Sequence, residues 1–148
     1  MKWLFRTNNS VALLINRLAL GIVMFPHGAQ KVFGWFGGQG YEGTVAAFVQ
    51  GGMPVPGVWL LMAIELLGSL GLIFGFMTRI AAFGIGGSLT ICALMNHVQN
   101  GFFMNWFGQQ QGEGFEFHIL AVGLALGLVI KGAGLLSIDR PLGKESKK

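Results

Sequence analysis

Hydrophobic positions gather into four long runs along the chain, and most polar residues lie between these runs. The runs cover residues 11–30, 57–77, 80–97 and 115–136. Each is close to the roughly 20 residues that cross a hydrocarbon core of about 30 Å. Because lipid cannot hydrogen-bond a free backbone, each run is expected to be helical. The pattern therefore predicts an all-α integral membrane four-helix bundle, with residues 1–148 forming a single transmembrane domain.

The composition excludes a soluble domain. Hydrophobic residues make up 53% of the chain and charged residues only 11%, with a mean hydropathy of +0.62. An ordinary soluble domain carries about 25% charged residues. The available polar surface could not cover four long apolar runs in water.

The basic residues predict how the chain is oriented in the membrane. Lys31 lies in the connection after the first run, whereas eight basic residues lie near the termini or the short second connection. These eight are Lys2, Arg6, Arg79, Lys131, Arg140, Lys144, Lys147 and Lys148. Because basic residues favour the cytoplasmic side, both termini are expected to face the cytoplasm. Residues 31–56 and 98–114 are then the outer loops.

The first outer loop is predicted to contain a short interfacial helix. In "TVAAFVQGGMPVPG", residues 44–57, Val45, Phe48 and Val49 fall on one side of a two-turn helix. The glycine pair and the proline that follow are typical helix stops.

Small residues spaced four apart predict where helices approach closely. Such pairs are Gly71 with Gly75, Gly84 with Ser88, and Gly123 with Gly127. They let backbones come together in lipid, where no hydrophobic force drives association. They indicate compact packing and carry no information about chemistry.

Two ionisable residues lie inside the runs. At 1.5 Å per residue, Arg17 is roughly 9 Å from the cytoplasmic end of the first run, and Glu65 is roughly 12 Å from the outer end of the second. An unpaired charge there costs at least about 2.5 to 3.5 kcal/mol. We therefore expect Arg17 and Glu65 to face each other, directly or through water or Asn16. The pair either fixes helix packing or lines a cavity on a ligand or proton path.

The first run is expected to be a retained helix rather than a cleaved signal peptide. Asn16 and Arg17 interrupt its apolar region, and no small-x-small cleavage site closes it.

Further polar residues gather at the predicted outer face. They are His27, Lys31, Asn96, His97, Glu116 and His118, and they include all three histidines of the chain. Three uses fit them: a metal site, hydrogen bonding and proton exchange with a quinone head group, or capping of helix ends in the headgroup zone. Metal is the weakest, because regular helical metal sites favour ligands three or four residues apart and no histidine has such a partner.

The third run adds a polar stripe at four-residue spacing, Ser88, Cys92 and Asn96. The stripe either makes interhelical hydrogen bonds or extends a cavity. Cys92 is the only cysteine, so the chain cannot form a disulfide within itself. The sequence contains no Walker loop, dinucleotide fingerprint, haem-attachment motif or nucleophile elbow. A quinone is therefore the one cofactor considered, with no metal, haem or nucleotide site evident.

Three stretches carry a resemblance to a known family. They are "RLALGIVMFPHGAQKVFGWFGGQGYEGTVAAF", "GMPVPGVWLLMAIELLGSLGLIFGFMTR" with its Glu65 and terminal Arg79, and the closing "LLSIDRPL". Together they span about residues 17–142 and resemble the DoxX family of small bacterial membrane proteins. The resemblance implies four transmembrane helices in the bacterial inner membrane. It also implies a redox association, because the family is named for a subunit of thiosulfate:quinone oxidoreductase and its members are linked to complexes that handle thiol or oxidative stress.

We interpret the chain as a quinone-linked redox component of a membrane complex, concerned with thiol, sulfur or oxidative-stress chemistry. Its pocket would lie in the outer half of the bundle. There Lys31 and the histidines would attract an anionic donor or a quinone oxygen. Glu65, held by Arg17, would accept or relay a proton, which makes these two the candidate catalytic residues.

The alternative belongs to another class: a small-solute or proton transporter, or a non-catalytic scaffold subunit. The expected partners are membrane lipid and either a redox partner protein or a second copy of the chain. No nucleic-acid partner is expected.

Overall fold

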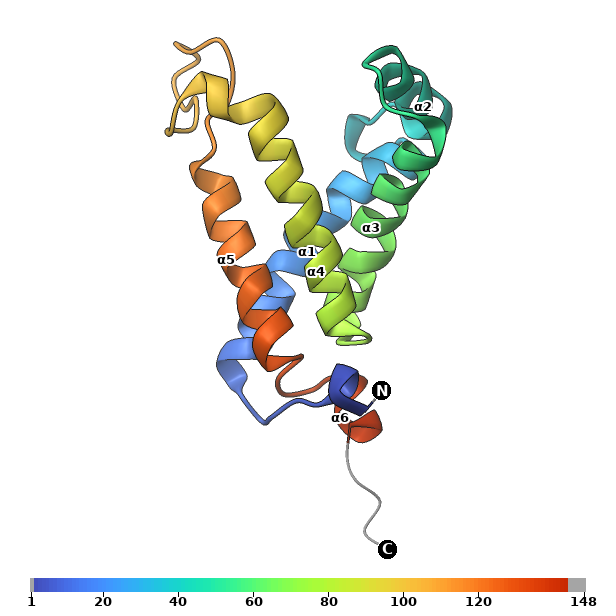
Figure 1. The fold of residues 1–148 in the computed structure, drawn as a ribbon, viewed down its shortest axis with the longest axis vertical. Helices are drawn as coiled ribbons and strands as arrows, with labels where there is room; N and C mark the ends of the chain where they lie inside the picture. The colour runs from blue at the N-terminus through green and yellow to red at the C-terminus, as the bar shows by residue number, and fades with distance from the viewer. Residues whose placement is uncertain (1, 144–148) are drawn as a thin grey trace, which may run out of the picture.

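The regular elements of residues 2–143 are all helices (Figure 1). The structure is a computed structural model that describes residues 2–143. Its elements are η1 (Lys2–Phe5), α1 (Val11–Phe33), η2 (Trp35–Gly37), α2 (Gly40–Gln50), α3 (Val55–Phe74), α4 (Thr78–Cys92), η3 (Ala93–His97), η4 (Val98–Asn100), α5 (Glu116–Lys131) and α6 (Asp139–Leu142). Residues 2–143 contain no strand, which confirms the prediction of an all-α chain.

Three helical stretches are long and apolar enough to cross a membrane. They are Val11–Phe33, Val55–Phe74 and Thr78–Asn100. The fourth predicted run is shorter than expected, since α5 has 16 residues and ends at Lys131 rather than at residue 136. Gly132 takes a φ of 85°, a conformation that suits glycine and ends the helix. Three spanning helices are thus supported, and a fourth stays a prediction.

The long helices pack in two pairs. In Figure 1, α1 lies beside α3 and α4 lies beside α5; the pairs meet in the lower half and diverge towards the top. The shared core contains Leu20 and Met24 of α1, Leu72 of α3, Ile85 of α4 and Leu128 of α5. The four helices are therefore held together mainly in their lower half.

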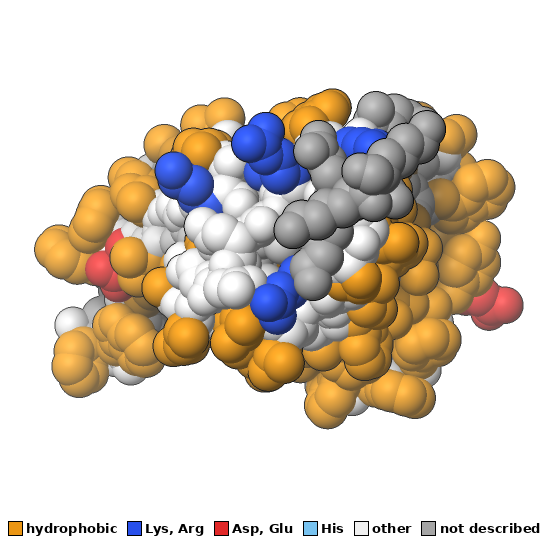
Figure 2. Space-filling model, turned by 90° about the horizontal axis from the view of Figure 1, so that it is seen from below, with side chains coloured by type: hydrophobic (Ala, Val, Ile, Leu, Met, Phe, Trp, Pro, Cys, Tyr) orange, Lys and Arg blue, Asp and Glu red, His pale blue; other side chains and the backbone are white. Residues whose placement is uncertain are grey.

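The two ends of the molecule differ in character. We call the lower end of Figure 1, where η1 and α6 lie, the basic end. Its described basic residues are Lys2, Arg6, Arg79, Lys131 and Arg140, and Figure 2 shows Lys and Arg side chains on this face. We call the opposite end, formed by η2, α2 and residues 101–115, the loop end.

Asp139 fixes the tight turn between α3 and α4. The residue is 1% exposed. Its Oδ1 accepts from the backbone N–H of Met77 at 2.7 Å, and its Oδ2 from that of Thr78 at 2.9 Å. A carboxylate at a helix N-terminus satisfies free N–H groups and complements the helix dipole. The segment after α5 therefore caps α4.

Arg79 ties the start of α4 to the end of α5. Its guanidinium donates to the carbonyls of Val129 and Ile130 in the last turn of α5, and to the carbonyl of Arg6 at 3.0 Å. A cation is favoured at a helix C-terminus, where carbonyls lack partners. The start of α4, the end of α5 and the segment after η1 thus meet at the basic end.

The predicted short helix in the loop after α1 is confirmed as α2. It is longer than expected because it begins at Gly40. Trp59 Nε1 in the first turns of α3 donates to the Tyr41 hydroxyl of α2 at 2.9 Å. This contact holds α2 against α3 at the loop end. Whether α2 lies in a membrane interface stays a prediction.

The glycines of the predicted pairs differ in whether they lie at a contact between helices. A Cβ added at Gly84 would lie 3.3 Å from Ile64, and one at Gly71 would lie 3.4 Å from the Cβ of Ala81. Those two positions do bring α3 and α4 together. Gly75 instead ends α3 in the left-handed conformation, with φ of 66°. In the third pair, a Cβ at Gly123 would have no described heavy atom within 4 Å, whereas one at Gly127 would lie 4.0 Å from Asn16 Nδ2 of α1, so only Gly127 faces another helix.

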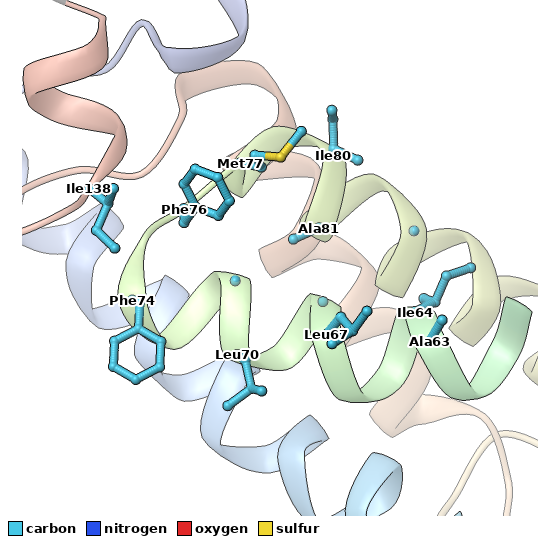
Figure 3. A pocket seen from close by; sticks show the side chains of 13 residues that line it. Ala63, Ile64, Leu67, Leu70, Phe74, Phe76, Met77, Ile80, Ala81 and Ile138 are labelled. Atoms are coloured by element: carbon cyan, nitrogen blue, oxygen red, sulfur yellow. The ribbon is translucent and has the colours of Figure 1, made fainter. Parts of the chain in front are cut away.

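An apolar groove of about 590 Å³ runs between α3 and α4 towards the basic end (Figure 3). In the view of Figure 3, Leu67, Phe74, Ile80 and Ile138 are among the side chains that border it. None of its lining residues is titratable. The groove suits an apolar chain and lies apart from the polar residues considered next.

Candidate functional site

Arg17 is enclosed by backbone carbonyls and is 1% exposed. Its Nε donates to Ala133 at 3.1 Å, Nη1 to Leu72 at 2.7 Å and Ile73 at 2.6 Å, and Nη2 to Leu135 at 3.3 Å and Leu136 at 2.9 Å. A guanidinium has five N–H donors, so every one has an acceptor. The carbonyls at the end of α3 lie at the negative end of the helix dipole, which favours a cation. Arg17 therefore joins the end of α3 to the segment after α5.

The prediction that Arg17 and Glu65 face each other, directly or through water or Asn16, is wrong, because all five N–H donors of Arg17 bind backbone carbonyls. Glu65 instead binds Lys31, with 2.6 Å between Nζ and Oε2. The expectation failed because residues 132–136 leave the helix and offer carbonyls to Arg17. The Glu65 side chain is 10% exposed and that of Lys31 20%. The pair is thus largely removed from solvent and joins α3 to α1.

Gly28 explains why Lys31 reaches Glu65. A Cβ at Gly28 would lie 2.6 Å from the backbone nitrogen of Leu66. No real Cβ tolerates such a contact, so the backbones of α1 and α3 touch here because the residue is glycine. Lys31 lies one turn further along α1 and Glu65 is adjacent to Leu66. The close approach places the two charged groups face to face.

A cavity of about 310 Å³ lies beside Lys31, between α1 and α2. It is lined by Gln30, Lys31, Gly38, Gln39, Thr44, Ala47 and Phe48. His27 is one turn before Lys31, and its ring is within reach of the charges of Lys31 and Glu65. His27 is exposed. Lys31 is thus the predicted site residue that both lines this cavity and contacts Glu65.

The other two histidines meet where α4 ends and α5 begins. The ring centroids of His97 and His118 are 4.3 Å apart. One ligand atom each from Cys92, His97 and His118 lies within 4.8 Å of the other two. We call these three residues the Cys92 cluster. His118 is 7% exposed, and His97 and Cys92 are half-buried.

Glu116 and Asn96 support backbone rather than a cavity. Glu116 Oε1 accepts from the backbone N–H of Met104 at 2.8 Å. Asn96 is exposed, and its Nδ2 donates to the carbonyl of Cys92 at 3.3 Å. Both side chains therefore brace the loop end. The predicted polar residues form two contact groups, the Lys31–Glu65 pair with His27 and the Cys92 cluster, and Cys92 is within reach of the charges of Lys31 and Glu65.

Sequence reasoning did not place Cys92 in the site, and it gave Asp139 no role. Cys92 appeared only as part of a stripe with Ser88 and Asn96. Ser88 instead donates to its own helix at Ile85, at 2.9 Å. The signal that was available is the gathering of both histidines and the only cysteine around one helix connection. Asp139 had no readable signal, because the backbone groups it caps are 61 and 62 residues away in the chain.

Comparisons with known proteins agree with this membrane fold. The sequence profile of the DoxX family, described simply as DoxX, matches residues 12–98. The chain is 31% identical over 137 residues to "Inner membrane protein YqjF" of Escherichia coli (strain K12), covering 91% of this chain and 95% of YqjF.

A shorter match links the chain to a second relative. It is 36% identical over 81 residues to "Putative oxidoreductase CatD" of Bacillus subtilis (strain 168), covering 55% of this chain and 54% of CatD. The matched region thus spans about half the length of CatD. No solved structure matches the chain. The profile match and the nearly full-length similarity to YqjF lead to one conclusion: this chain is a membrane protein of the DoxX family.

Proposed function

We propose that the chain is a quinone-linked redox component of a membrane complex. The observation that carries the proposal is the ion pair of Lys31 and Glu65, held at 2.6 Å between apolar helices and beside a cavity. Ionisable groups inside a membrane are rare and usually mark ligand or proton paths. The printed name of one relative, "Putative oxidoreductase CatD", adds support for redox chemistry.

The proposed membrane arrangement has α5 as a fourth span and both termini on the cytoplasmic side. Because Arg79 ties the end of α5 to the start of α4, α5 returns to the side from which α4 leaves. At 1.5 Å per residue its 16 residues reach about 24 Å, somewhat less than the hydrocarbon thickness. A short span of this kind is accommodated by local thinning of the bilayer.

The cavity beside Lys31 suits a small ring with polar edges. Its volume of about 310 Å³ lies at the lower limit of ligand sites, which run from about 300 to 1,000 Å³. Phe48 offers an apolar surface, while Gln39 and Thr44 offer hydrogen-bonding groups. The ammonium of Lys31 would donate to one oxygen of a quinone head group. The isoprenoid tail would remain in lipid.

The proposed reaction transfers two electrons from thiols to the quinone. Two thiols lose their S–H bonds and form one disulfide, and the quinone gains two O–H bonds and becomes a quinol. Lys31 would deliver a proton to the quinone oxygen, and Glu65 would relay the replacement. Because the chain has one cysteine, the thiol pair must belong to a partner protein or a small donor.

Photoaffinity labelling tests whether a quinone binds here. The full chain in lipid nanodiscs is exposed to an azidoquinone, and the labelled peptides are identified by mass spectrometry. We expect labelling of α1 and α2 near Lys31, reduced at least tenfold by Lys31→Met and by Glu65→Gln. Glu42→Gln is the matched control, since Glu42 is an exposed carboxylate on α2 and should label like the original chain.

A second assay separates the function classes. Membrane vesicles are supplied with a dithiol and a quinone, and thiol-dependent quinol formation is followed in the original chain and in Glu65→Gln. Labelling and quinol formation that do not respond to Glu65→Gln would overturn the proposal. If a proton or solute flux in liposomes depends on Glu65 while no quinone binds, the chain is a transporter. If neither quinol formation nor flux depends on Glu65, the chain is a scaffold subunit.

A further inference from the structure

The Cys92 cluster combines three soft or borderline metal ligands from two helices. Cys92 is the last residue of α4, His97 is the last residue of the π-helical turn η3, and His118 lies in the first turn of α5. Their ligand atoms all lie within 4.8 Å of one another. One thiolate and two imidazoles are donors that zinc and its neighbours in the first transition row prefer.

The π-helical turn is what brings Cys92 and His97 together. The two residues are five apart, a spacing that places side chains on different faces of a regular α-helix. In a π-helix the hydrogen bonds join residues five apart, so such residues stack one turn above the other. Residues 93–97 form this turn. π-turns inside helices are frequent at functional sites.

His118 provides an independent sign of a ligand. The residue is 7% exposed, and within the described chain its buried Nδ1 has no hydrogen-bond partner. Buried polar atoms in native proteins are almost always satisfied. The ring lies against His97, whose ring is 4.3 Å away by centroid, so another protein group has little room to approach from that side. An ion between the two rings and the thiol would satisfy the nitrogen.

His97 is already oriented as a ligand. Its Nδ1 is 2.9 Å from the carbonyl oxygen of Glu113. A carbonyl can only accept, so the proton is on Nδ1 and the lone pair is on Nε2. Metal-binding histidines typically donate their other N–H to a carbonyl or carboxylate in this way. Asn100 Nδ2 donates to the same carbonyl at 3.0 Å and helps to fix its position.

We propose that Cys92, His97 and His118 bind a thiophilic divalent transition-metal ion of the zinc class, with a fourth position open to water or an exogenous ligand. With Zn–S of about 2.3 Å and Zn–N of about 2.0 to 2.1 Å, ligand atoms around a tetrahedral ion lie about 3.4 to 3.6 Å apart. The observed limit of 4.8 Å exceeds this spacing by about 1.2 to 1.4 Å, so the three side chains would have to close slightly around the ion. The site shares no residue with the Lys31–Glu65 pair, and its test does not depend on the quinone proposal.

Cobalt spectroscopy tests the site directly. The full chain, carrying an affinity tag without histidine, is stripped with a chelator in detergent and titrated with Co²⁺. We expect one equivalent to give visible d–d bands and a near-ultraviolet thiolate-to-cobalt charge-transfer band, both bleached by one equivalent of Zn²⁺. Because the chain contains a single cysteine, the charge-transfer band reports Cys92 alone.

Variants show whether the three residues act together. Cys92→Ser should remove the charge-transfer band, and His97→Gln or His118→Gln should weaken Co²⁺ binding at least tenfold. His27→Gln is the matched control, because His27 is the third histidine and lies outside the cluster. Elution volume and circular dichroism verify that each variant is folded, and Cys92→Ser suffices if a histidine variant is not.

Three outcomes would overturn the proposal. One is a folded original chain that gives no charge-transfer band and retains no Zn²⁺ by elemental analysis. Another is equal metal affinity in the original chain and in Cys92→Ser. The third is binding that is lost in His27→Gln, which would place the metal elsewhere.

Discussion

Two buried charges in this protein are neutralised by different means. Arg17 is surrounded by five backbone carbonyls, whereas Glu65 is paired with the ammonium of Lys31. A charge in the bilayer needs some such partner, because leaving it alone is costly. Arginine suits a fork of carbonyls because its planar group presents donors in fixed directions. The two residues therefore serve different contacts: Arg17 joins the end of α3 to the segment after α5, and Glu65 joins α3 to α1 through Lys31.

Arg17→Lys should destabilise the protein although the charge is kept. Lysine has three donors on a flexible stem and cannot serve five carbonyls in these directions. Leaving buried carbonyls unpaired should cost roughly 3 kcal/mol of unfolding free energy. Thermal or urea unfolding of both proteins in detergent micelles measures this loss of unfolding free energy.

Arg6→Lys is the control for this prediction. Arg6 is exposed, and its described hydrogen bonds involve its backbone N–H and carbonyl, not its side chain. Equal unfolding free energies for the two variants would contradict the proposed role of the carbonyl cage.

At the residue scale, the sequence predicted the need for partners but not the partners themselves. The depth of Glu65 within an apolar run is readable from residue counting. Choosing Arg17 as its mate assumed straight helices in register and ignored the backbone as an acceptor. The chain after α5 provides three of the five carbonyls, from Ala133, Leu135 and Leu136. No pattern of side chains in the sequence predicts that backbone carbonyls will surround Arg17.

The contact between α1 and α3 depends on one small residue. Gly28 lets the helix backbones touch at Leu66, and this contact sets the height at which Lys31 meets Glu65. Helix packing in lipid relies on such close approaches. The site is therefore positioned by an element-scale feature rather than by its own side chains.

Gly28→Ala should push α1 away from α3. The added Cβ would meet the backbone of Leu66 and Glu65 at 2.6 to 2.8 Å, and backbone cannot rotate aside. We expect a loss of about 1 to 3 kcal/mol in unfolding free energy, the usual cost of overpacking. Quinone labelling near Lys31 should fall with it. Unfolding in denaturant and azidoquinone labelling provide the two measurements.

Gly123→Ala is the matched change for this prediction. Its Cβ would meet no described heavy atom within 4 Å, and alanine favours helix by up to about 1 kcal/mol over glycine. That variant should be as stable as the original chain or slightly more so. A Gly28→Ala protein that matches it in both measurements would rule out the close-approach explanation.

Helix positions were readable from the sequence to within a few residues at most ends, because apolar runs stop at glycine and proline. Two features of the helices could not be predicted from the sequence. The end of α5 at Lys131 was missed because Gly132 and the apolar residues after it continue the hydrophobic pattern. The π-turn of residues 93–97 was missed because it differs from an α-helix by one residue in hydrogen-bond spacing and leaves the polarity pattern unchanged. That turn decides which partners Cys92 can have.

The helices are joined by polar contacts at the basic end, and the two helix pairs diverge towards the loop end. Arg17, Arg79 and Asp139 join segments distant in sequence near the basic end. In Figure 1 the two helix pairs separate towards the loop end. Lys31 in the last turn of α1 and the Cys92 cluster at the connection from α4 to α5 lie towards this end. The polar contacts that join the helices at the basic end could therefore not be predicted from the sequence. The titratable residues, whose clustering at one face was predictable, lie where the helix pairs separate.

Labelling of single cysteines should reveal the number of membrane crossings. In a Cys92→Ser background, Lys2→Cys, Glu42→Cys and Lys131→Cys are each treated with a membrane-impermeant maleimide. We expect Glu42→Cys to react in right-side-out vesicles, and the other two to react only in inverted vesicles. All three native side chains are exposed, so accessibility reports the side of the membrane.

Lys131→Cys is the informative member of this set. If it reacts from the side opposite to Lys2→Cys, α5 does not cross as proposed and the positive-inside reasoning fails for the last segment. Reaction from the same side would establish an even number of crossings.

The carbonyl cage around Arg17 also implies an order of events during synthesis. Three of the five carbonyls that Arg17 binds are synthesised 116 to 119 residues after the arginine itself. Until they are made, only the two carbonyls of α3 are available to its guanidinium. A segment made later therefore acts as a latch on α1. A nascent chain interrupted before this latch forms carries an unsatisfied cation that distinguishes it from the finished protein.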